Sequence, residues 1–372
     1  MVIVVGLGYI GGINAYYLSS KTKVFVDEVD DKKITKFNLK QPIFDEVDLD
    51  WALFYDRVSL ASSLPKVQSD MLVVVCVDAP VNDGTYDLSA ITKVLKKYSN
   101  NPVIVRSTLD SVAIENLSNF EHRNLYYWPE FIREGSALAD MKRDTDYLAP
   151  ITSNDSSDIQ TRLHLLLGKD LIVSKDPKAL ATAKSFSNAF RALKVTLGNS
   201  LEPYMFQNNV DYEEFLSIFG SLRGNLDLSY LRPGGPYGGF CLTKEVEFWA
   251  KATSDAESIN IFKSVHLINE SAIERKTKEI VNAGVRCVAF ESFAFKEGTD
   301  DVRRSPFIAV AKGLESQNIK IIDLFNTSKG EFSGITTEEN IDAYFCAGNI
   351  EKSQIKASRV NLNLSKIKCF YW

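Results

Sequence analysis

The sequence predicts an α/β protein in which a parallel sheet at the amino terminus is followed by a long helical region and a shorter third α/β segment. The run Val2 to Val5 is followed at once by glycines, a helical stretch from Ile13 to Ser20 and a second strand, Lys23 to Val26. This strand–helix–strand order requires parallel strands joined by a right-handed crossover. The continuous apolar run Met71 to Val77 has the length of a central parallel strand buried on both faces.

The rest of the first segment, residues 1–175, continues the alternation of strands and helices. We expect strands at Pro102 to Arg106, at Leu125 to Trp128 and at Leu171 to Val173, and a helix from Leu88 to Tyr98. Strands that alternate with helical stretches indicate further parallel pairing in the same sheet.

The middle segment, residues 176–275, changes to long helices. Pro177 stands where a helix can begin, and the helical periodicity extends from Ala179 to Phe206. The Pro/Gly-rich stretch Arg232 to Gly239 is expected to be a loop, and a helix follows over Lys244 to Lys251. A helix as long as the first one usually spans between domains or builds a subunit interface.

The third segment, residues 276–372, opens with an expected strand at Arg286 to Phe290 and contains another at Lys320 to Leu324. Beyond Gly330 the periodic signals are weak. From the residues alone, this segment is α/β without a defined topology.

Composition and charge exclude several classes of protein. The 372 residues are 45% hydrophobic and 24% charged, which is typical of a globular chain with two or three domains. A net charge of −5 argues against a nucleic-acid partner, and no apolar run reaches the length of a membrane span. The amino terminus lacks a basic leader and a small-residue cleavage site, so we interpret it as a buried strand.

The cysteines and histidines indicate neither a disulfide framework nor a metal site. The cysteines are odd in number and widely spread, at Cys76, Cys241, Cys287, Cys346 and Cys369. This pattern favours a reducing compartment, and we expect the protein to be cytoplasmic. The three histidines form no triad or metal-ligand spacing, so we expect no metal ion.

A glycine motif indicates a dinucleotide site. Gly6, Gly8 and Gly11 form G-x-G-x-x-G between the first strand and the first helix. The first glycine makes the tight turn, the second admits the pyrophosphate, and the third lets helix and strand pack closely. Asp27 lies at the end of the second strand, about 20 residues on, where a carboxylate accepts bonds from the ribose hydroxyls and repels a 2′-phosphate. The motif therefore favours NAD over NADP, with FAD as the main competitor.

Four further motifs follow in order along nearly the whole chain: PEFIREG at 129–135, AKSFSNAF at 183–190, GGFCLTKE at 238–245 and FKEGTDDVR at 295–303. Together they resemble the UDP-glucose/GDP-mannose dehydrogenase family, whose corresponding motifs read PEFLREG, GG-x-CLPKD and FK-x-GTDD-x-R. The resemblance implies an N-terminal Rossmann domain, a long central helix in a homodimer interface and a C-terminal Rossmann-like domain. It also implies NAD as cofactor and a nucleotide sugar as substrate.

The family's chemistry converts a primary alcohol to an acid, which removes four electrons and uses NAD twice. A thiolate can retain the intermediate aldehyde as a thiohemiacetal and then as a thioester that water hydrolyses. Cys241 follows a glycine loop and opens a helix, and a helix amino terminus or a neighbouring cation favours the thiolate. We therefore assign Cys241 as the nucleophile and interpret the other four cysteines as inert.

The resemblance also implies roles for individual residues. Lys184 stabilises the developing oxyanion, Asn188 positions the sugar, and Thr108 with Glu134 holds the water that acts as base and attacks the thioester. Glu245 occupies the position of the family's acid after the cysteine. The expected substrate-binding residues are Glu130, Phe131, Ile132, Arg133, Lys184, Asn188, Tyr237, Gly238, Gly239, Lys296 and Arg303. The expected cofactor-binding residues are Gly6, Gly8, Tyr9, Ile10, Gly11, Asp27, Lys32, Ala79, Pro80, Thr108, Glu134 and Arg303.

Several positions depart from the family pattern. Glu245 replaces an Asp, Thr243 replaces a Pro, and Ala79 replaces a Thr near the cofactor. The family's STVP-x-G reads Ser107-Thr108-Leu109-Asp110, without the Pro and Gly. A carboxylate displaced by about 1 Å can cost on the order of a hundredfold in rate, so these changes bear on activity and substrate.

Three functions are therefore compared. The leading one is oxidation of UDP-glucose to UDP-glucuronate, which PEFIREG-S-AL-A-D and the short chain favour; the YLRPG stretch at 230–234 resembles the GDP-mannose branch and keeps that substrate as the alternative. A two-electron hydroxyacid dehydrogenase on a similar fold needs no cysteine, so the GG-x-C loop counts against it. The third is a relative that binds nucleotide sugars with weakened chemistry, as Glu245 and Thr243 suggest.

Overall fold

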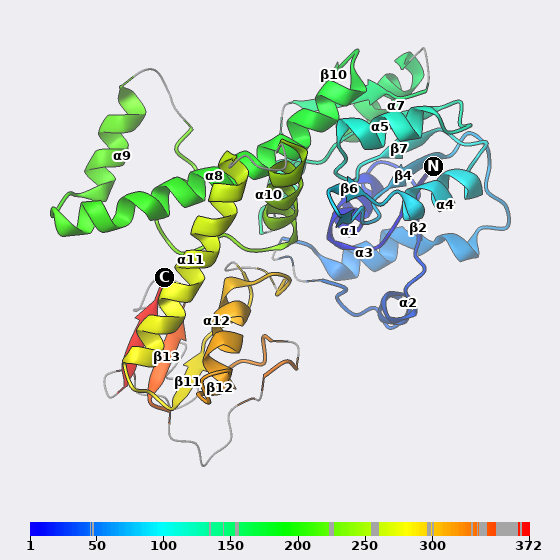
Figure 1. Ribbon diagram of the computed structural model, residues 1–372. Helices are drawn as coiled ribbons and strands as arrows, with labels where there is room; N and C mark the ends of the chain where they lie inside the picture. The colour runs from blue at the N-terminus through cyan, green and yellow to red at the C-terminus, as the bar shows by residue number, and fades with distance from the viewer. Residues whose placement is uncertain are drawn as a thin grey trace. The chain divides into compact units, whose positions relative to one another are not determined.

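The computed structural model describes residues 1–44, 46, 48–133, 135–143, 145–152, 156–222, 227–253, 260–295, 299, 301–328, 330–332, 334, 341–346, 364 and 367–372 (Figure 1). The chain divides into two units, Met1–Ser187 and Asn188–Trp372. Each unit is described by itself below.

The sheet of the first unit runs in the order β10-β9-β8-β7-β4-β1-β2-β3. Its strands are β1 (Val2–Val5), β2 (Val24–Asp27), β3 (Val58–Leu60), β4 (Leu72–Val75), β7 (Val103–Val105), β8 (Leu125–Tyr127), β9 (Asp146–Pro150) and β10 (Leu171–Val173). The part from β3 to β8 has the Rossmann order 3-2-1-4-5-6, with every pair parallel. The strand order reverses between β1 and β4, which is where α/β sheets of this kind bind ligands.

Several helices of the first unit begin at an aspartate that caps them. The helices of this unit are α1 (Tyr9–Ser19), α2 (Asp31–Asn38), α3 (Trp51–Arg57), the short 3₁₀ turn η1 (Ala61–Ser63), α4 (Ser89–Lys97), α5 (Ser111–Ser118), α6 (Ala137–Met141), α7 (Ser157–Leu167) and the start of α8 (Pro177–Gln207). Asp30, Asp50 and Asp110 accept backbone N–H bonds at the starts of α2, α3 and α5. A small hairpin of β5 (Val81–Asn82) and β6 (Thr85–Tyr86) follows β4.

The central strands are buried throughout, as their apolar sequences predict. β1 and β4 expose at most a few per cent of any side chain. One difference from the predicted parallel sheet lies at its edge, where β9 pairs antiparallel with β8 before β10 pairs parallel with β9. This reversal adds two strands beyond the Rossmann order without disturbing the carboxyl edge of β1, β4 and β7.

Among its described residues, the second unit contains the rest of α8, four further helices and a parallel sheet. The helices before the sheet are α9 (Tyr212–Ser221), α10 (Phe240–Ala252) and α11 (Ile261–Asn282). The sheet has the order β12-β11-β13-β14, from β11 (Cys287–Phe290), β12 (Lys320–Asp323), β13 (Ala343–Cys346) and β14 (Lys368–Tyr371), with α12 (Pro306–Glu315) between β11 and β12. The predicted helix Ala179 to Phe206 and both predicted strands are present, and β13 and β14 lie beyond Gly330, where the periodic signals are weak.

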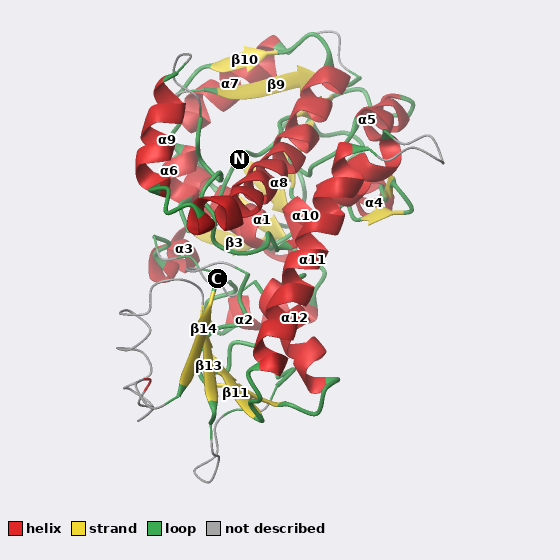
Figure 2. Cartoon of the chain, turned by 60° about the vertical axis from the view of Figure 1, so that its left-hand side comes forward, coloured by secondary structure: helices red, strands yellow, loops and turns green. Residues whose placement is uncertain are grey.

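Helices α11 and α12 cover one face of the C-terminal sheet (Figure 2). Ile280 of α11 and Phe307, Val310 and Leu314 of α12 pack in one core with Phe290 and its neighbours on the sheet. The structure thus adds what the sequence alone left open, a parallel α/β topology for the third segment. Among the described residues, no helix combines the length and apolar character needed to cross a membrane.

Candidate functional site

The glycine turn after β1 has the shape of a phosphate cradle. Gly6 has φ of +91°, and a Cβ there would lie 2.9 Å from the carbonyl oxygen of Cys76. A Cβ at Gly11 would lie 1.8 Å from the carbonyl oxygen of Gly6. A Cβ at Gly8 would meet no described atom within 4 Å, so the space beside this amino-terminal cap of α1 is open. Packing therefore requires glycine at positions 6 and 11, and Gly8 leaves room for a dinucleotide to approach.

Asp27 ends β2 beside this turn and has two partners. Its Oδ2 accepts hydrogen bonds from the Tyr98 hydroxyl and from Lys97 Nζ, each at 2.7 Å. Burial, and then the contact with Asp27, raise the pKa of Tyr98, so its hydroxyl stays a donor. These contacts hold the carboxylate at the end of β2, where a ribose is expected.

Two acids that the sequence analysis missed support the same turn. Glu28 accepts the Leu7 N–H at 2.6 Å, and Leu7 is the residue between the first two glycines. The buried Glu46 accepts the Tyr9 hydroxyl, and it also accepts the Gly135 N–H at 3.1 Å. Glu28 could have been found from its position beside Asp27, but Glu46 lies in no motif and only the fold brings it to Tyr9.

Lys184 and Glu130 form a buried ion pair within the first unit. The Nζ of Lys184 lies 3.0 Å from Oε1 of Glu130, and both side chains are at most 10% exposed. The Ile132 N–H donates to the other carboxylate oxygen at 2.7 Å, and the ring of Phe131 lies 5.1 Å from Lys184 Nζ. Glu130 and Phe131, two predicted substrate residues of the PEFIREG motif, therefore lie next to Lys184 of α8.

The charge of Glu130 is maintained against burial. Burial by itself would raise the pKa of this carboxyl, but Lys184, the Ile132 N–H and Arg106 together hold the pKa below its ordinary value. Arg106 follows β7 and is 1% exposed, with its guanidinium 3.6 Å from the ring centre of Trp128. The carboxyl edge of the sheet therefore holds a lysine cation and a carboxylate out of water, an arrangement suited to stabilising charge in a reaction.

The remaining predicted positions of the first unit lie around the same edge. Thr108 is half-buried after β7, the neighbouring Ser107 donates to the Val77 carbonyl at 2.6 Å, and Ala79 is buried after β4. Pro80 follows Ala79, Ile10 lies in the first turn of α1, and Lys32 is exposed in the first turn of α2. The guanidinium of Arg133 is held by Asp140 through bonds of 2.8 and 3.0 Å.

Cys241 is the second residue of α10 in the second unit and is exposed. The helix begins at Phe240, before the predicted stretch Lys244 to Lys251, and Cys241 lies in its first turn, as expected for a cysteine that opens a helix. Gly239 has φ of +79°, and a Cβ there would lie 2.9 Å from the Phe295 ring; one at Gly238 would lie 2.5 Å from Pro306. The loop before the thiol therefore admits only glycine.

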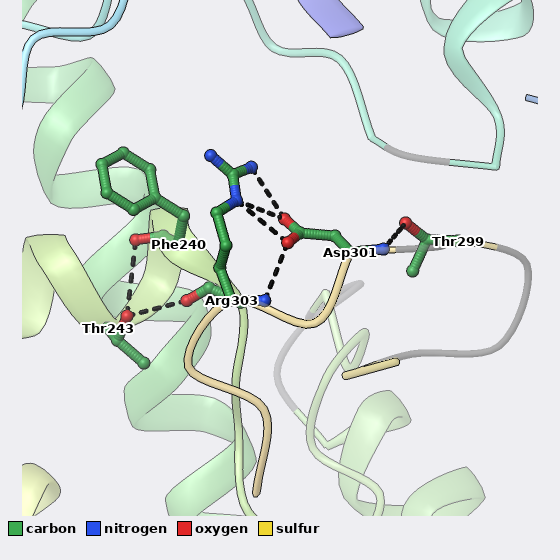
Figure 3. A network of polar contacts seen from close by, with 6 residues as sticks. Phe240, Thr243, Thr299, Asp301 and Arg303 are labelled. Carbon is green, nitrogen blue, oxygen red and sulfur yellow. Dashed lines mark hydrogen bonds and ion pairs between the residues drawn. The ribbon is translucent and has the colours of Figure 1, made fainter. Parts of the chain in front are cut away.

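Charged residues gather around this first turn of α10. Arg303 donates through Nε and Nη2 to the Asp301 carboxylate at 2.7 to 3.1 Å, and its guanidinium lies 5.0 Å from the Phe240 ring centre (Figure 3). Lys244 and Glu245 are both buried, with Nζ and Oε1 3.2 Å apart. The acid that replaces the family's Asp thus has a cation as its neighbour.

Two other predicted substrate residues lie in the second unit. Asn188 is 4% exposed, and its Oδ1 accepts a bond of 2.9 Å from Arg191. Tyr237 is buried with Val246 and Phe262, and burial raises the pKa of its hydroxyl. Its backbone N–H and carbonyl are both bonded to the Asn269 side chain, at 2.9 and 3.1 Å.

Comparison with known proteins places this geometry in a family. Residues 1–164 match the NAD binding domain of the UDP-glucose/GDP-mannose dehydrogenase family, and residues 179–271 match its central domain. The chain belongs to the UDP-glucose/GDP-mannose dehydrogenase family. It is an enzyme of that family, and its cofactor is NAD, whose phosphates the Gly6–Gly11 cradle fits.

Relatives of both substrate types are similar to this dehydrogenase. The UDP-glucose 6-dehydrogenase of Campylobacter jejuni is 25% identical over 340 residues, covering 86% of this chain and 84% of that protein. The GDP-mannose 6-dehydrogenase of Pseudomonas savastanoi pv. phaseolicola is 27% identical over 342 residues, covering 83% and 77%. A UDP-glucose dehydrogenase structure from Pyrobaculum islandicum has a TM-score of 0.80 at 21% identity, over 100% of this chain and 93% of that one, and shows the shared fold.

Two expected site residues of this dehydrogenase, Glu134 and Lys296, lie outside the described residues. For the cysteines read as inert, the structure gives all four a clear setting. Burial raises the pKa of Cys76 to about 12, and Cys287 and Cys346 are buried in strands β11 and β13. Cys369, in β14, is half-buried, and burial raises its pKa as well. Thiols of this kind are poor nucleophiles, whereas Cys241 is exposed at the start of a helix.

Proposed function

We propose that this dehydrogenase oxidises UDP-glucose to UDP-glucuronate in a four-electron reaction through a covalent intermediate on Cys241. The observation that carries the proposal is the exposed thiol at the start of α10, behind a loop whose backbone only glycine can adopt. The thiol of Cys241 therefore lies at the amino terminus of α10. The positive end of the helix dipole stabilises a thiolate at this position.

The proposed chemistry divides among the residues as follows. When held at the turn of Gly6, Gly8 and Gly11, NAD would supply the hydride acceptor for each of two successive oxidations. Between them, the Cys241 thiolate adds to the aldehyde carbon, and the oxyanion that forms takes its stabilisation from Lys184. After the second oxidation the acyl group is a thioester, and attack by water releases the carboxylate and regenerates the thiolate.

The ion pair of the first unit supports the assignment of Lys184. Its Nζ is desolvated, and Glu130 and the Phe131 ring fix it from two sides. A preorganised cation of this kind stabilises developing negative charge more than a solvated surface lysine does. We assign the water that acts as base and later attacks the thioester to Thr108 and Glu134, the sugar contacts to Asn188, and support of the Cys241 helix to Glu245.

The sugar nucleotide is proposed on sequence features, with GDP-mannose as the alternative. The stretch PEFIREG-S-AL-A-D resembles the UDP-glucose type, and the YLRPG loop at 230–234 resembles the GDP-mannose type. The similar relatives include both a UDP-glucose and a GDP-mannose 6-dehydrogenase at nearly equal identity.

The test offers the purified protein a panel of nucleotide sugars with NAD and follows NADH. We expect turnover with UDP-glucose and two NADH per sugar oxidised. Turnover with GDP-mannose alone would overturn the substrate, and one NADH per sugar would overturn the four-electron reaction. Cys241→Ser should stall after the first oxidation or trap a covalent ester, so unchanged turnover in that variant would remove the mechanism.

We also propose a homodimer built on the central helices, in the cytoplasm. Large apolar side chains are exposed along α8 and α9, including Leu197, Tyr204, Phe206, Ile218 and Leu222. Exposed large apolar side chains on neighbouring helices favour an interaction site there, and no described helix could cross a membrane. Light scattering that found only a monomer would contradict the dimer. The five free cysteines fit a reducing compartment.

A further inference from the structure

The cysteine loop and the loop before α12 are packed against each other within the second unit. Gly238 lies so close to this second loop that a Cβ would come within 3.0 Å of the Arg304 carbonyl oxygen and 2.5 Å of Pro306. A Cβ at Gly239 would lie 2.9 Å from the Phe295 ring. Residues 301–305 therefore lie directly beside the first turn of α10, which carries Cys241.

Arg304 connects this second loop to α10 through its side chain. Its Nη1 lies 3.2 Å from the Thr243 hydroxyl, to which it donates, and 2.7 Å from Oε1 of Glu247. Thr243 and Glu247 are four residues apart, so they lie on one face of α10 in successive turns. One guanidinium group thus holds the helix at two points.

The contact with Thr243 leads directly to the cap of the cysteine helix. The Thr243 hydroxyl accepts from Arg304 and donates to the Gly239 carbonyl at 2.7 Å, and Gly239 is the residue that caps α10. Figure 3 shows Thr243 beside Phe240 in this turn. A hydroxyl that accepts one hydrogen bond while it donates another becomes the better donor, because the two bonds polarise each other. Arg304 therefore acts on the turn that holds Cys241 through one intermediate side chain.

The backbone of Arg304 indicates that this contact is imposed on the loop. Its φ is +52°, in the left-handed region that residues other than glycine, asparagine and aspartate seldom adopt. Such a conformation persists where surrounding contacts over-determine it. The surrounding contacts include those of Arg304 with Thr243 and Glu247, and the adjacent Arg303, which Asp301 holds over the Phe240 ring.

We propose that Arg304 is a positioning residue for the Cys241 thiol, acting through Thr243 and Glu247 to hold the first turn of α10 against the 301–305 loop. The proposal rests on the proposed role of Cys241 as nucleophile. It also gives Thr243 a function: the hydroxyl at this position, where the family motif has a proline, receives the arginine that holds the turn.

Arg304→Asn is the variant of choice, because asparagine tolerates the left-handed backbone while it removes the guanidinium. Two rates are measured on the full chain: alkylation of Cys241 by iodoacetamide, followed on its peptide by mass spectrometry, and NADH formation. We expect both to fall about fivefold, the factor that corresponds to one net hydrogen bond. Arg304→Lys, which keeps the cation, should recover most of the loss.

A double-variant cycle separates this role from a general loss of stability. Both variants remove the Arg304–Thr243 bond, so the alkylation loss in Thr243→Val combined with Arg304→Asn should be smaller than the product of the two single losses. Lys312→Ala is the matched control, because it removes a different ion pair of the same unit, with Glu331, and should leave both rates unchanged.

Wild-type alkylation in Arg304→Asn, or full additivity with Thr243→Val, would overturn the positioning role. An equal loss in Lys312→Ala would overturn it as well. These outcomes do not depend on the identity of the substrate. Failure of the nucleophile assignment would be seen separately, as unchanged NADH formation in Cys241→Ser.

Discussion

Replacing Lys184 with methionine should destabilise the first unit by an amount that depends on pH. Methionine fills nearly the volume of the lysine stem, so the change removes a charge and leaves little cavity. Glu130 would then remain as a buried carboxylate with the Ile132 N–H and the charge of Arg106 but without its ion pair. Removing one partner of a buried pair costs about 3–5 kcal/mol of unfolding free energy, because the other charge stays desolvated.

The pH dependence identifies the cause. In the wild type the pKa of Glu130 is held below its ordinary value, so the pair stabilises the fold above the pKa of the unfolded carboxyl and this contribution is lost as the pH falls through the folded one. In the variant, the Lys184 cation no longer offsets the burial of Glu130, so the pKa of Glu130 in the folded state rises. The unfolded chain then ionises first as the pH increases. The variant should therefore be nearly as stable as the wild type at acidic pH and fall furthest behind at neutral pH.

The assay is a urea titration at several pH values between about 4 and 8, read by hydrogen exchange of β7 and β8 peptides so that it reports the first unit alone. Lys178→Met is the control, since Lys178 lies on the same helix and forms an exposed pair with Glu115 at 2.9 Å; it should cost less than about 1 kcal/mol. Adding Glu130→Gln to Lys184→Met should restore much of the loss. A destabilisation that stayed constant across this pH range would refute the reasoning and indicate a packing defect.

Two further predictions concern the cofactor and the cysteine loop. Asp27→Asn should raise the KM for NAD about tenfold and reduce the preference for NAD over NADP, because the ribose loses an anionic acceptor; initial rates with both cofactors measure this, and an unchanged preference would contradict the role of Asp27. Gly239→Ala should lower kcat at least about tenfold while NAD binding to the first unit, measured by fluorescence titration, stays intact, since the new methyl group would lie 2.9 Å from the Phe295 ring in a left-handed backbone. Wild-type turnover in that variant would show that the loop can relax.

The central strands and the glycine turn of the first unit were predictable because their signals are local. The central strand β1 and the edge strand β10 have the expected bounds, and Gly6 and Gly11 are required by close contacts with backbone carbonyl oxygens. The antiparallel β9 was not predictable, since a short strand gives no local sign of its direction. β13 and β14 are four-residue strands that pair over long sequence separations, and their apolar runs are too short to stand out.

Some residues of the site were likewise predictable from local motifs, and others were recognisable only from the structure. Lys184 and Glu130 were expected from two motifs, but the 3.0 Å separation of their charged atoms follows from how α8 packs on the sheet. Glu46 and Arg106 belong to no motif that the sequence analysis used, and they are recognisable only from burial and contacts. A polar residue whose partners lie far along the chain carries no signal in its own neighbourhood.

The departures from the family pattern are met by local contacts in the structure. Asp110, in the turn that lost its Pro and Gly, accepts the Ala113 N–H at 2.8 Å and caps α5. Thr243 bonds to the Gly239 carbonyl and receives Arg304, and Glu245 is buried beside Lys244. A chain that had kept only nucleotide-sugar binding would be under no physical requirement to hold the turn around Cys241 so closely. The contacts of Thr243 and Glu245 therefore favour an active enzyme over a relative that only binds nucleotide sugars. Both residues lie in α10, the helix that carries Cys241.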